Sequence, residues 1–363
     1  MTLKQTLEIC ELLESARVDG EAVRELLRDR GAGPDEVTVT RLEGSREERG
    51  SGPGSGHGGS GTGSGPEGSG PGNTPGTDFV RVVIGGRTGR RAGGTAPTLG
   101  VIGRLGGVGA RPEVIGLVSD ADGAVVALAA ALKLLDLRRA GDRLAGDVIV
   151  ATHICPSAPT EPHDPVPFMG APVDMRLMNE HEVSREMDAI LSIDTTKGNR
   201  VINSRGFAIS PTVKEGWILR VSEDLLETMA VTTGEPPRTF PVTMQDITPY
   251  GNGVHHINSI LQPSVATSAP VVGVAVTTVT AVPGCASGAS HEVDLAEAVR
   301  FVVEVAKGFT AGRISFYSAE EFSRLVELYG PMTHLQTPGR GKGQDSSRPS
   351  RPDTPVGPSG DGR

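Results

Sequence analysis

The stretch "IGLVSDADGAVVALAAALKLLDL", residues 115–137, decides the fold. It starts as an apolar run, passes two aspartates and a glycine, and continues as a helical segment that is apolar on nearly every side. A surface helix carries one apolar stripe, whereas a helix that is apolar all round lies inside the protein. We therefore predict a buried strand over 114–119, a turn from Asp120 to Gly123, and a helix over 123–139 that is covered by other layers.

Strands and helices alternate on both sides of this stretch. Apolar runs and periodic segments predict strands at 78–84, 98–103, 147–152, 189–194, 240–244 and 270–276, and helices at 222–232, 254–261 and 294–307. Such alternation predicts an α/β fold, a three-layer sandwich with a mixed, largely parallel sheet. In such sheets ligands bind at the carboxyl ends of the strands.

Changes in composition divide the chain. The predicted parts are an N-terminal helical element (1–43), a disordered insertion rich in Gly, Ser and Pro (44–77), the α/β core domain (78–336) and a disordered tail (337–363).

The N-terminal element is predicted to hold two short amphipathic helices. Leu3, Leu7 and Leu13 are spaced to line one face of the first, and Asp19 stands where an N-cap would open the second. These helices have no evident core of their own, so a role in a homo-oligomer is open.

Composition narrows the class of partner. The 35 basic and 44 acidic residues give a net charge of −9, which argues against a nucleic-acid surface. No apolar run reaches the roughly 20 residues needed to cross a membrane. The three cysteines form no C-x-x-C pair, which is typical of a reducing compartment. We expect a soluble, cytoplasmic protein with a small-molecule or peptide partner, and neither nucleic acid nor membrane.

Metal-competent side chains follow the predicted strands. Asp120, His153, Asp194 and His291 come after strands that should lie side by side. A mixed set of carboxylates and imidazoles suits Zn²⁺, with Mn²⁺ or Co²⁺ as alternatives, and can activate water. Each residue also has a structural explanation: a helix cap for Asp120 or His291, a satisfied core histidine for His153, and an Asx turn for Asp194.

Two further segments carry polar side chains suited to a substrate. "SIDTTKGNR" places Lys197 and Arg200 beside the predicted metal ligand Asp194, where they would bind a carboxylate or phosphate, or balance the charge of that aspartate. "TPYGNGVHHINSIL" offers Asn252 and His256 for substrate binding and His255 as a catalytic group for the oxyanion. Neighbouring helical residues point about 100° apart, so only one of the two histidines should face the site.

The segment "SDADGAVVALAAALKLLDLRRAGDRLAGDVIVAT" resembles co-catalytic zinc aminopeptidases and deacylases, in which such an aspartate bridges two metal ions; that aspartate corresponds to Asp120. "MDAILSIDTTKGN" and "PVVGVAVTTVTAVPGCASGASHEVD" are similar to the segments that supply their later ligands, which implies metal roles for Asp194 and His291. The resemblance implies a zinc-aminopeptidase-like fold.

Two parts of that pattern are missing. Residues 78–119 contain no histidine to match the first ligand, and "THICPSAP" stands where those enzymes carry a Glu-Glu pair. His153 could replace the ligand of that pair, and Glu161 or Asp164 could replace its general base. A third hypothesis uses Cys155 as a nucleophile.

Over the whole chain the sequence resembles an uncharacterised prokaryotic family, domain of unknown function 1177. The motifs are "APTLGVIGRLGGVGARPE", "THICPSAPTEPHDPVPFMGAPVD", "SIDTTKGNR", "QDITPYGNGVHHINSILQP" and "GASHEVD". The sequence thus predicts a metal-dependent hydrolase of the aminopeptidase or deacylase type, acting on a small peptide or N-acyl compound. The alternative is a non-catalytic protein on a degenerate peptidase fold that binds a small metabolite or peptide.

Overall fold

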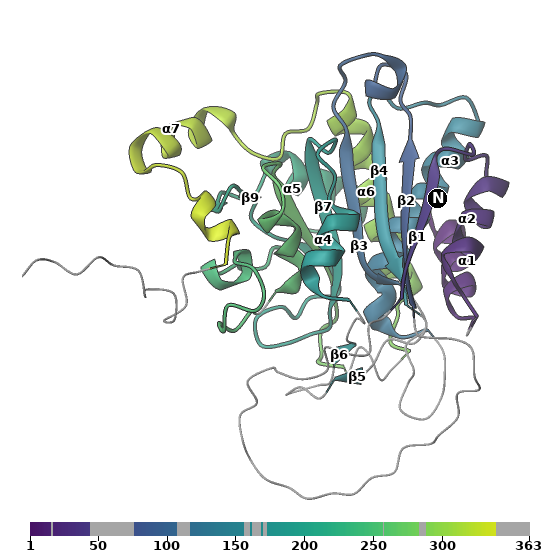
Figure 1. The fold of residues 1–363 in the computed structure, drawn as a ribbon, viewed down its shortest axis with the longest axis horizontal. Coiled ribbons are helices and arrows are strands. Elements are labelled where there is room, and N and C mark those ends of the chain that lie inside the picture. The colour runs from purple at the N-terminus through teal and green to yellow at the C-terminus, as the bar shows by residue number, and fades with distance from the viewer. Residues whose placement is uncertain are drawn as a thin grey trace, which may run out of the picture.

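A computed structural model describes residues 1–15, 17–43, 76–106, 117–155, 160–161, 168–169, 173–256, 258–282 and 288–338 (Figure 1). The predicted insertion and tail therefore lie almost entirely outside the described residues. No helix among the residues described is long and apolar enough to cross a membrane.

A mixed sheet forms the middle of the molecule. Its strands run in the order β1-β2-β4-β3-β7-β11-β9-β10, and β8 pairs with β11. β3, β4, β7 and β11 are parallel neighbours, while β1, β2, β8 and β9 pair antiparallel. The prediction of an α/β fold with a mixed, largely parallel sheet is confirmed.

The elements have the following bounds. The strands are β1 (Val37–Glu43), β2 (Gly76–Ile84), β3 (Leu99–Gly106), β4 (Val148–Ile154), β5 (Thr160–Glu161), β6 (Phe168–Met169), β7 (Ala189–Thr196), β8 (Gly206–Ile209), β9 (Val213–Lys214), β10 (Trp217–Ile218) and β11 (Val271–Thr277). The α-helices are α1 (Leu3–Leu13), α2 (Gly20–Asp29), α3 (Asp122–Arg139), α4 (Met175–Glu182), α5 (Glu223–Thr233), α6 (Glu292–Thr310) and α7 (Ala319–Tyr329). The 3₁₀ helices are η1 (Arg90–Ala92), η2 (Ser119–Ala121), η3 (Met244–Ile247), η4 (Ser259–Val265) and η5 (Thr333–Gln336).

Helices cover both faces of the sheet. α3, α6 and the N-terminal helices pack on one face, and their apolar residues join those of the sheet in one large hydrophobic cluster. α4 and η4 lie on the opposite face, where a second apolar cluster forms (Figure 1). The molecule is therefore a three-layer sandwich.

α3 is the helix predicted from the opening stretch, and it is buried on all sides. It packs on β3 with one face and on α1 and α6 with others, so nearly every residue up to Leu135 is buried. Gly123 is required at its start: a Cβ there would lie 2.5 Å from the carbonyl oxygen of Ile193 and 2.8 Å from that of Arg104. The missing side chain lets the helix begin against the sheet.

Some local predictions are wrong. Residues 117–118 are not in a strand and lead into η2; 114–116 lie outside the described residues. The segment 240–244 is not a strand either. Pro241 offers no N–H for a ladder, and Thr243 instead forms a capping box with Asp246 at the start of η3.

The two predicted N-terminal helices are present as α1 and α2, but the buried face of α1 differs from the predicted one. Asp19 caps α2 by accepting a hydrogen bond from the Ala22 N–H. In α1, however, Leu3 and Leu7 are exposed and the buried face contains Thr6, Ile9 and Leu13.

Candidate functional site

The carboxyl ends of three neighbouring strands place polar residues on one face of the sheet. Side chains alternate between faces along a strand. Each polar residue therefore shares its face with an apolar residue two or four positions earlier, which belongs to the second apolar cluster. The pairs are Ile102 with Arg104 in β3, Ile149 with His153 in β4, and Ile190 with Asp194 in β7.

Glu182, at the end of α4, joins two of these strand ends. Its Oε2 accepts a hydrogen bond from Arg104 Nη1 at 2.7 Å, and its Oε1 lies 2.5 Å from His153 Nδ1. Asn179, one turn earlier in α4, accepts a second hydrogen bond from Arg104 at 3.1 Å. Arg104, His153 and Glu182 are all buried. We call Arg104, His153, Glu182 and Asp194 the strand-end cluster.

His153 has one engaged and one unengaged ring nitrogen. Nδ1 faces the Glu182 carboxylate, whereas the buried Nε2 has no hydrogen-bond partner among the described residues. A carboxylate on one ring nitrogen favours the tautomer whose other nitrogen carries a free lone pair. This nitrogen is suited to accept a proton or to bind a metal.

Asp194 adds a half-buried carboxylate. It accepts hydrogen bonds from the Thr195 N–H at 2.7 Å and from the Ser259 hydroxyl at 3.1 Å. Burial raises the pKa of Asp194, although the Thr195 hydrogen bond and the charges of Arg104 and His153 act in the opposite direction. Tyr250 lies beside it, and burial followed by the charge of Asp194 raises the pKa of that phenol to about 12.

A second polar group lies at the start of α3. Lys197 Nζ donates to Asp122 Oδ2 at 2.6 Å with both side chains buried, and Ser290 also donates to Asp122. The sequence left two roles open for Lys197, binding a ligand or balancing the charge of Asp194. Lys197 does balance a carboxylate, but that carboxylate belongs to Asp122. Asp120 lies in η2 and is half-buried.

The predicted metal set is not assembled by the described residues. His153 and Asp194 share the strand-end cluster, whereas His291 is exposed at the N-cap position of α6, near Asp122. Among the residues that the structure describes, no three His, Cys, Asp or Glu side chains are grouped so that they could hold a metal ion. A catalytic zinc site needs three protein ligands. The described residues therefore do not fit the predicted ion.

The predicted substrate and catalytic residues are spread out. His256 packs against Tyr250 in a tilted arrangement with ring centroids 4.5 Å apart, and Asn252 donates to the Thr248 hydroxyl at 2.7 Å. His255 and Arg200 are exposed. Only one of the two adjacent histidines therefore touches a residue beside the cluster.

The two proposed general bases cannot be placed. Glu161 belongs to the short strand β5, whose side chains lie outside the description, and Asp164 lies outside the described residues.

Sequence reasoning missed Arg104, Glu182 and the buried role of Asp122. The signal for Arg104 was present: a charged residue in an otherwise apolar strand, two positions after Ile102 on the same face.

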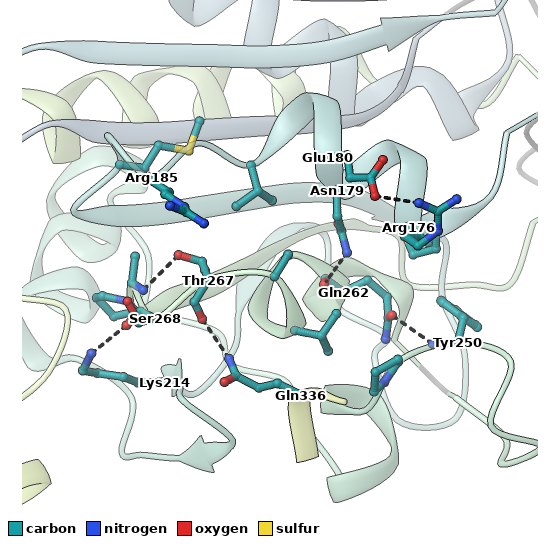
Figure 2. Close-up of a pocket in the computed structure, with 18 of the residues that line it drawn as sticks. Arg176, Asn179, Glu180, Arg185, Lys214, Tyr250, Gln262, Thr267, Ser268 and Gln336 are labelled. Carbon is teal, nitrogen blue, oxygen red and sulfur yellow. Dashed lines mark hydrogen bonds and ion pairs between the residues drawn. The ribbon is translucent and has the colours of Figure 1, made fainter. Parts of the chain in front are cut away.

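A cavity of about 1280 Å³ opens next to the cluster, between α4 and the segment from η4 to β11 (Figure 2). Asn179, Tyr250 and Gln262 line it at one side. Asn179 also contacts Arg104, and its amide donates to the Gln262 carbonyl at 3.0 Å. The cavity wall and the strand-end cluster are therefore one connected set of contacts.

Comparison with known proteins supplies a family. The family model described as "Protein of unknown function (DUF1177)" matches residues 70–339. The chain belongs to this family. Curated proteins give no match to the DUF1177 chain.

Three of the solved structures that match the DUF1177 chain are aminopeptidases. LapA aminopeptidase of Legionella pneumophila is 10% identical, with 87% of this chain and 71% of that chain covered and a TM-score of 0.43. Cytosol aminopeptidase from Coxiella burnetii is 12% identical, with 86% and 70% covered and a TM-score of 0.45. A tomato leucine aminopeptidase is 12% identical, with 83% and 61% covered and a TM-score of 0.45. Similarity at this level transfers no residue's role to the DUF1177 chain.

Proposed function

We propose that this DUF1177 protein is an amide hydrolase that acts on a small peptide or N-acyl compound at the strand-end cluster. The observation that carries the proposal is His153, whose Nδ1 is held by the Glu182 carboxylate while its buried Nε2 has no partner among the described residues. An imidazole oriented in this way by a carboxylate is an effective general base.

The reaction needs one proton to move twice. His153 Nε2 takes a proton from water as the water oxygen forms a bond to the amide carbon. The proton then passes to the leaving nitrogen as the carbon–nitrogen bond breaks. Glu182 stabilises the imidazolium in between, because its carboxylate lies 2.5 Å from Nδ1.

A divalent metal, zinc before manganese or cobalt, stays a prediction. His153 and Asp194 are the two predicted ligands that share the strand-end cluster, one fewer than a catalytic zinc site needs. No step of the proposed reaction therefore runs through the ion. Elemental mass spectrometry on protein purified without a metal-affinity tag measures the metal content directly. Near-stoichiometric metal that disappears in a His153→Gln, Asp194→Asn variant would support metal-dependent chemistry; metal that persists in the variant would place the ion elsewhere.

The activity test is a screen of dipeptides and N-acetyl amino acids, followed by mass spectrometry of the products. We expect His153→Gln to lower kcat/KM by about 10²–10⁴-fold. His334→Gln is the matched control, because His334 is exposed in η5 and should leave kcat/KM unchanged. Equal activity in the wild type and His153→Gln would refute the assignment of the base.

A second candidate function is binding without hydrolysis. The cavity is lined by Asn179 and Tyr250 and not by His153, which is fully buried. Binding of a small peptide by a wild-type protein that turns over none of the screened amides would favour this second candidate.

A further inference from the structure

The cavity runs along α4 and combines apolar with polar walls. Met175, Val183 and Val265 contribute apolar surface, while the opposite side contains the backbone of Thr267 and Ser268. The Thr267 carbonyl accepts from Gln336 at 2.8 Å, and the Ser268 carbonyl accepts from Lys214 at 2.6 Å. The volume exceeds that of an ordinary small-ligand pocket, which is about 300–1,000 Å³.

Nearly every charged side chain on its wall already has a partner within the protein. The contacts are Arg176–Glu180 at 2.6 Å, Asp188–Arg90 at 2.7 Å, Lys214–Glu215 at 2.7 Å, and the Asp174 carboxylate accepting from the Leu177 N–H at 2.8 Å. The three ion pairs balance their own charges, whereas the Asp174 carboxylate has a helix-capping hydrogen bond.

Arg185 is different. It lines the cavity from the turn between α4 and β7, and no carboxylate among the described residues forms an ion pair with it. Figure 2 shows its side chain projecting toward the cavity, whereas Arg176 turns to Glu180. Arg185 is therefore the cation on the described cavity wall that has no ion-pair partner, and a guanidinium binds carboxylates through two parallel hydrogen bonds.

We propose that this cavity binds a small organic carboxylate of about the size of a tripeptide, with the carboxylate on Arg185. The eight residues of α4 span about 12 Å, which matches three to four residues of extended chain. Met175 at the start of α4 and Arg185 just beyond its end both line the cavity. A ligand of this length anchored at Arg185 therefore lies along α4 and passes Asn179, on the side of the cavity next to the strand-end cluster. The apolar wall contacts its middle.

The proposal deepens the proposed function by naming the charged end of the substrate. Turnover of that substrate rests on His153, but binding does not, because His153 does not line the cavity. The two ideas can therefore fail separately.

The test is isothermal titration calorimetry with N-acetyl-trialanine and with its C-terminal amide, which differ only in the carboxylate. We expect the acid to bind the wild type and the amide to bind about fivefold to tenfold more weakly, a modest factor because Arg185 is exposed. Arg185→Gln should lower the affinity for the acid to that for the amide. Arg313→Gln, the same change at an exposed arginine that does not line the cavity, should leave the difference intact.

Three outcomes would overturn the proposal: no binding of the acid at millimolar concentration, equal binding of acid and amide, or an unchanged affinity in Arg185→Gln. A His153→Gln variant separates this proposal from the proposed function. Binding with carboxylate preference in that variant supports the cavity even if the wild type turns over no amide, whereas turnover without carboxylate preference supports only the catalytic base.

Discussion

Glu182 is the residue whose change tests the strand-end cluster most directly. Its side chain is 1% exposed, and that of its ion-pair partner Arg104 is 4% exposed. The substitution Glu182→Gln keeps the shape and removes the charge, so a buried guanidinium loses its counter-charge. Breaking a buried ion pair by removing one partner costs about 3–5 kcal/mol of unfolding free energy. At about 2–4 °C per kcal/mol for a protein of this size, the melting temperature should fall by about 6–20 °C.

Glu180 offers a matched control on the same helix. It pairs with Arg176, and the two side chains are 53% and 69% exposed. Glu180→Gln removes the same charge at the surface, where such a pair contributes no more than about 0.5 kcal/mol. Urea unfolding followed by circular dichroism gives both free energies, and the slope against urea shows whether the unfolded states are comparable.

A second substitution separates charge burial from packing. Arg104→Met removes the guanidinium that Glu182→Gln leaves uncompensated, so the double variant should be more stable than Glu182→Gln alone. A loss below about 1 kcal/mol in Glu182→Gln, or strictly additive losses in the double variant, would refute the buried ion pair as the feature that holds α4 to the sheet.

Further predictions concern the other strand ends. Gly123→Ala should destabilise the protein by about 1–3 kcal/mol, because its Cβ would meet a strand carbonyl oxygen at 2.5 Å. Gly33→Ala should not destabilise the protein, because its Cβ has no neighbour closer than 3.5 Å. Equal thermal unfolding curves for the two variants would contradict the close approach at Gly123. Lys197→Met should lower the free energy of unfolding by about 3–5 kcal/mol, because it leaves the buried Asp122 carboxylate without its cation. Adding Asp122→Asn should restore part of the loss in the urea midpoint. No restoration would mean that the Lys197–Asp122 pair is not the cause of the loss. Asp194→Asn should stabilise the protein at neutral pH. A carboxyl whose pKa is raised in the folded state lowers the stability of the protein as the pH rises from the ordinary pKa of 3.8 through the raised pKa. That gain should shrink as the pH is lowered toward 3.8, and a gain that is constant with pH would contradict the raised pKa.

The layered fold could be predicted from the sequence because it depends on local patterns. An all-round apolar helix after 123 required cover on both sides, and the structure provides it with β3, α1 and α6. The order of polar residues after apolar runs also predicted strand-end positions for His153 and Asp194, which lie at the ends of β4 and β7 with β3 between them. These inferences need only the periodicity of side chains and the rule for parallel strands.

The rest of the site depends on contacts between distant residues. Arg104 meets Glu182 across 78 positions, and Asp122 meets Lys197 across 75. α4, which supplies Glu182, is only eight residues long, and such a short helix gives little periodicity to detect. No local pattern distinguishes Asp120 from Asp122, because the geometry of η2 decides which aspartate is buried.

The two carboxylates at the strand ends differ in a way that separates structure from chemistry. Asp122 is neutralised by Lys197 at 2.6 Å, so its burial is compensated inside the protein. Asp194 receives hydrogen bonds from Thr195 and Ser259, but no lysine or arginine of the described residues forms an ion pair with it. Asp194 is half-buried, and a desolvated carboxylate without an ion-pair partner destabilises the folded state. Folded proteins commonly keep such a group where it binds a ligand or moves a proton. Substitution of Asp122 should therefore lower stability, whereas substitution of Asp194 should raise stability and lower activity.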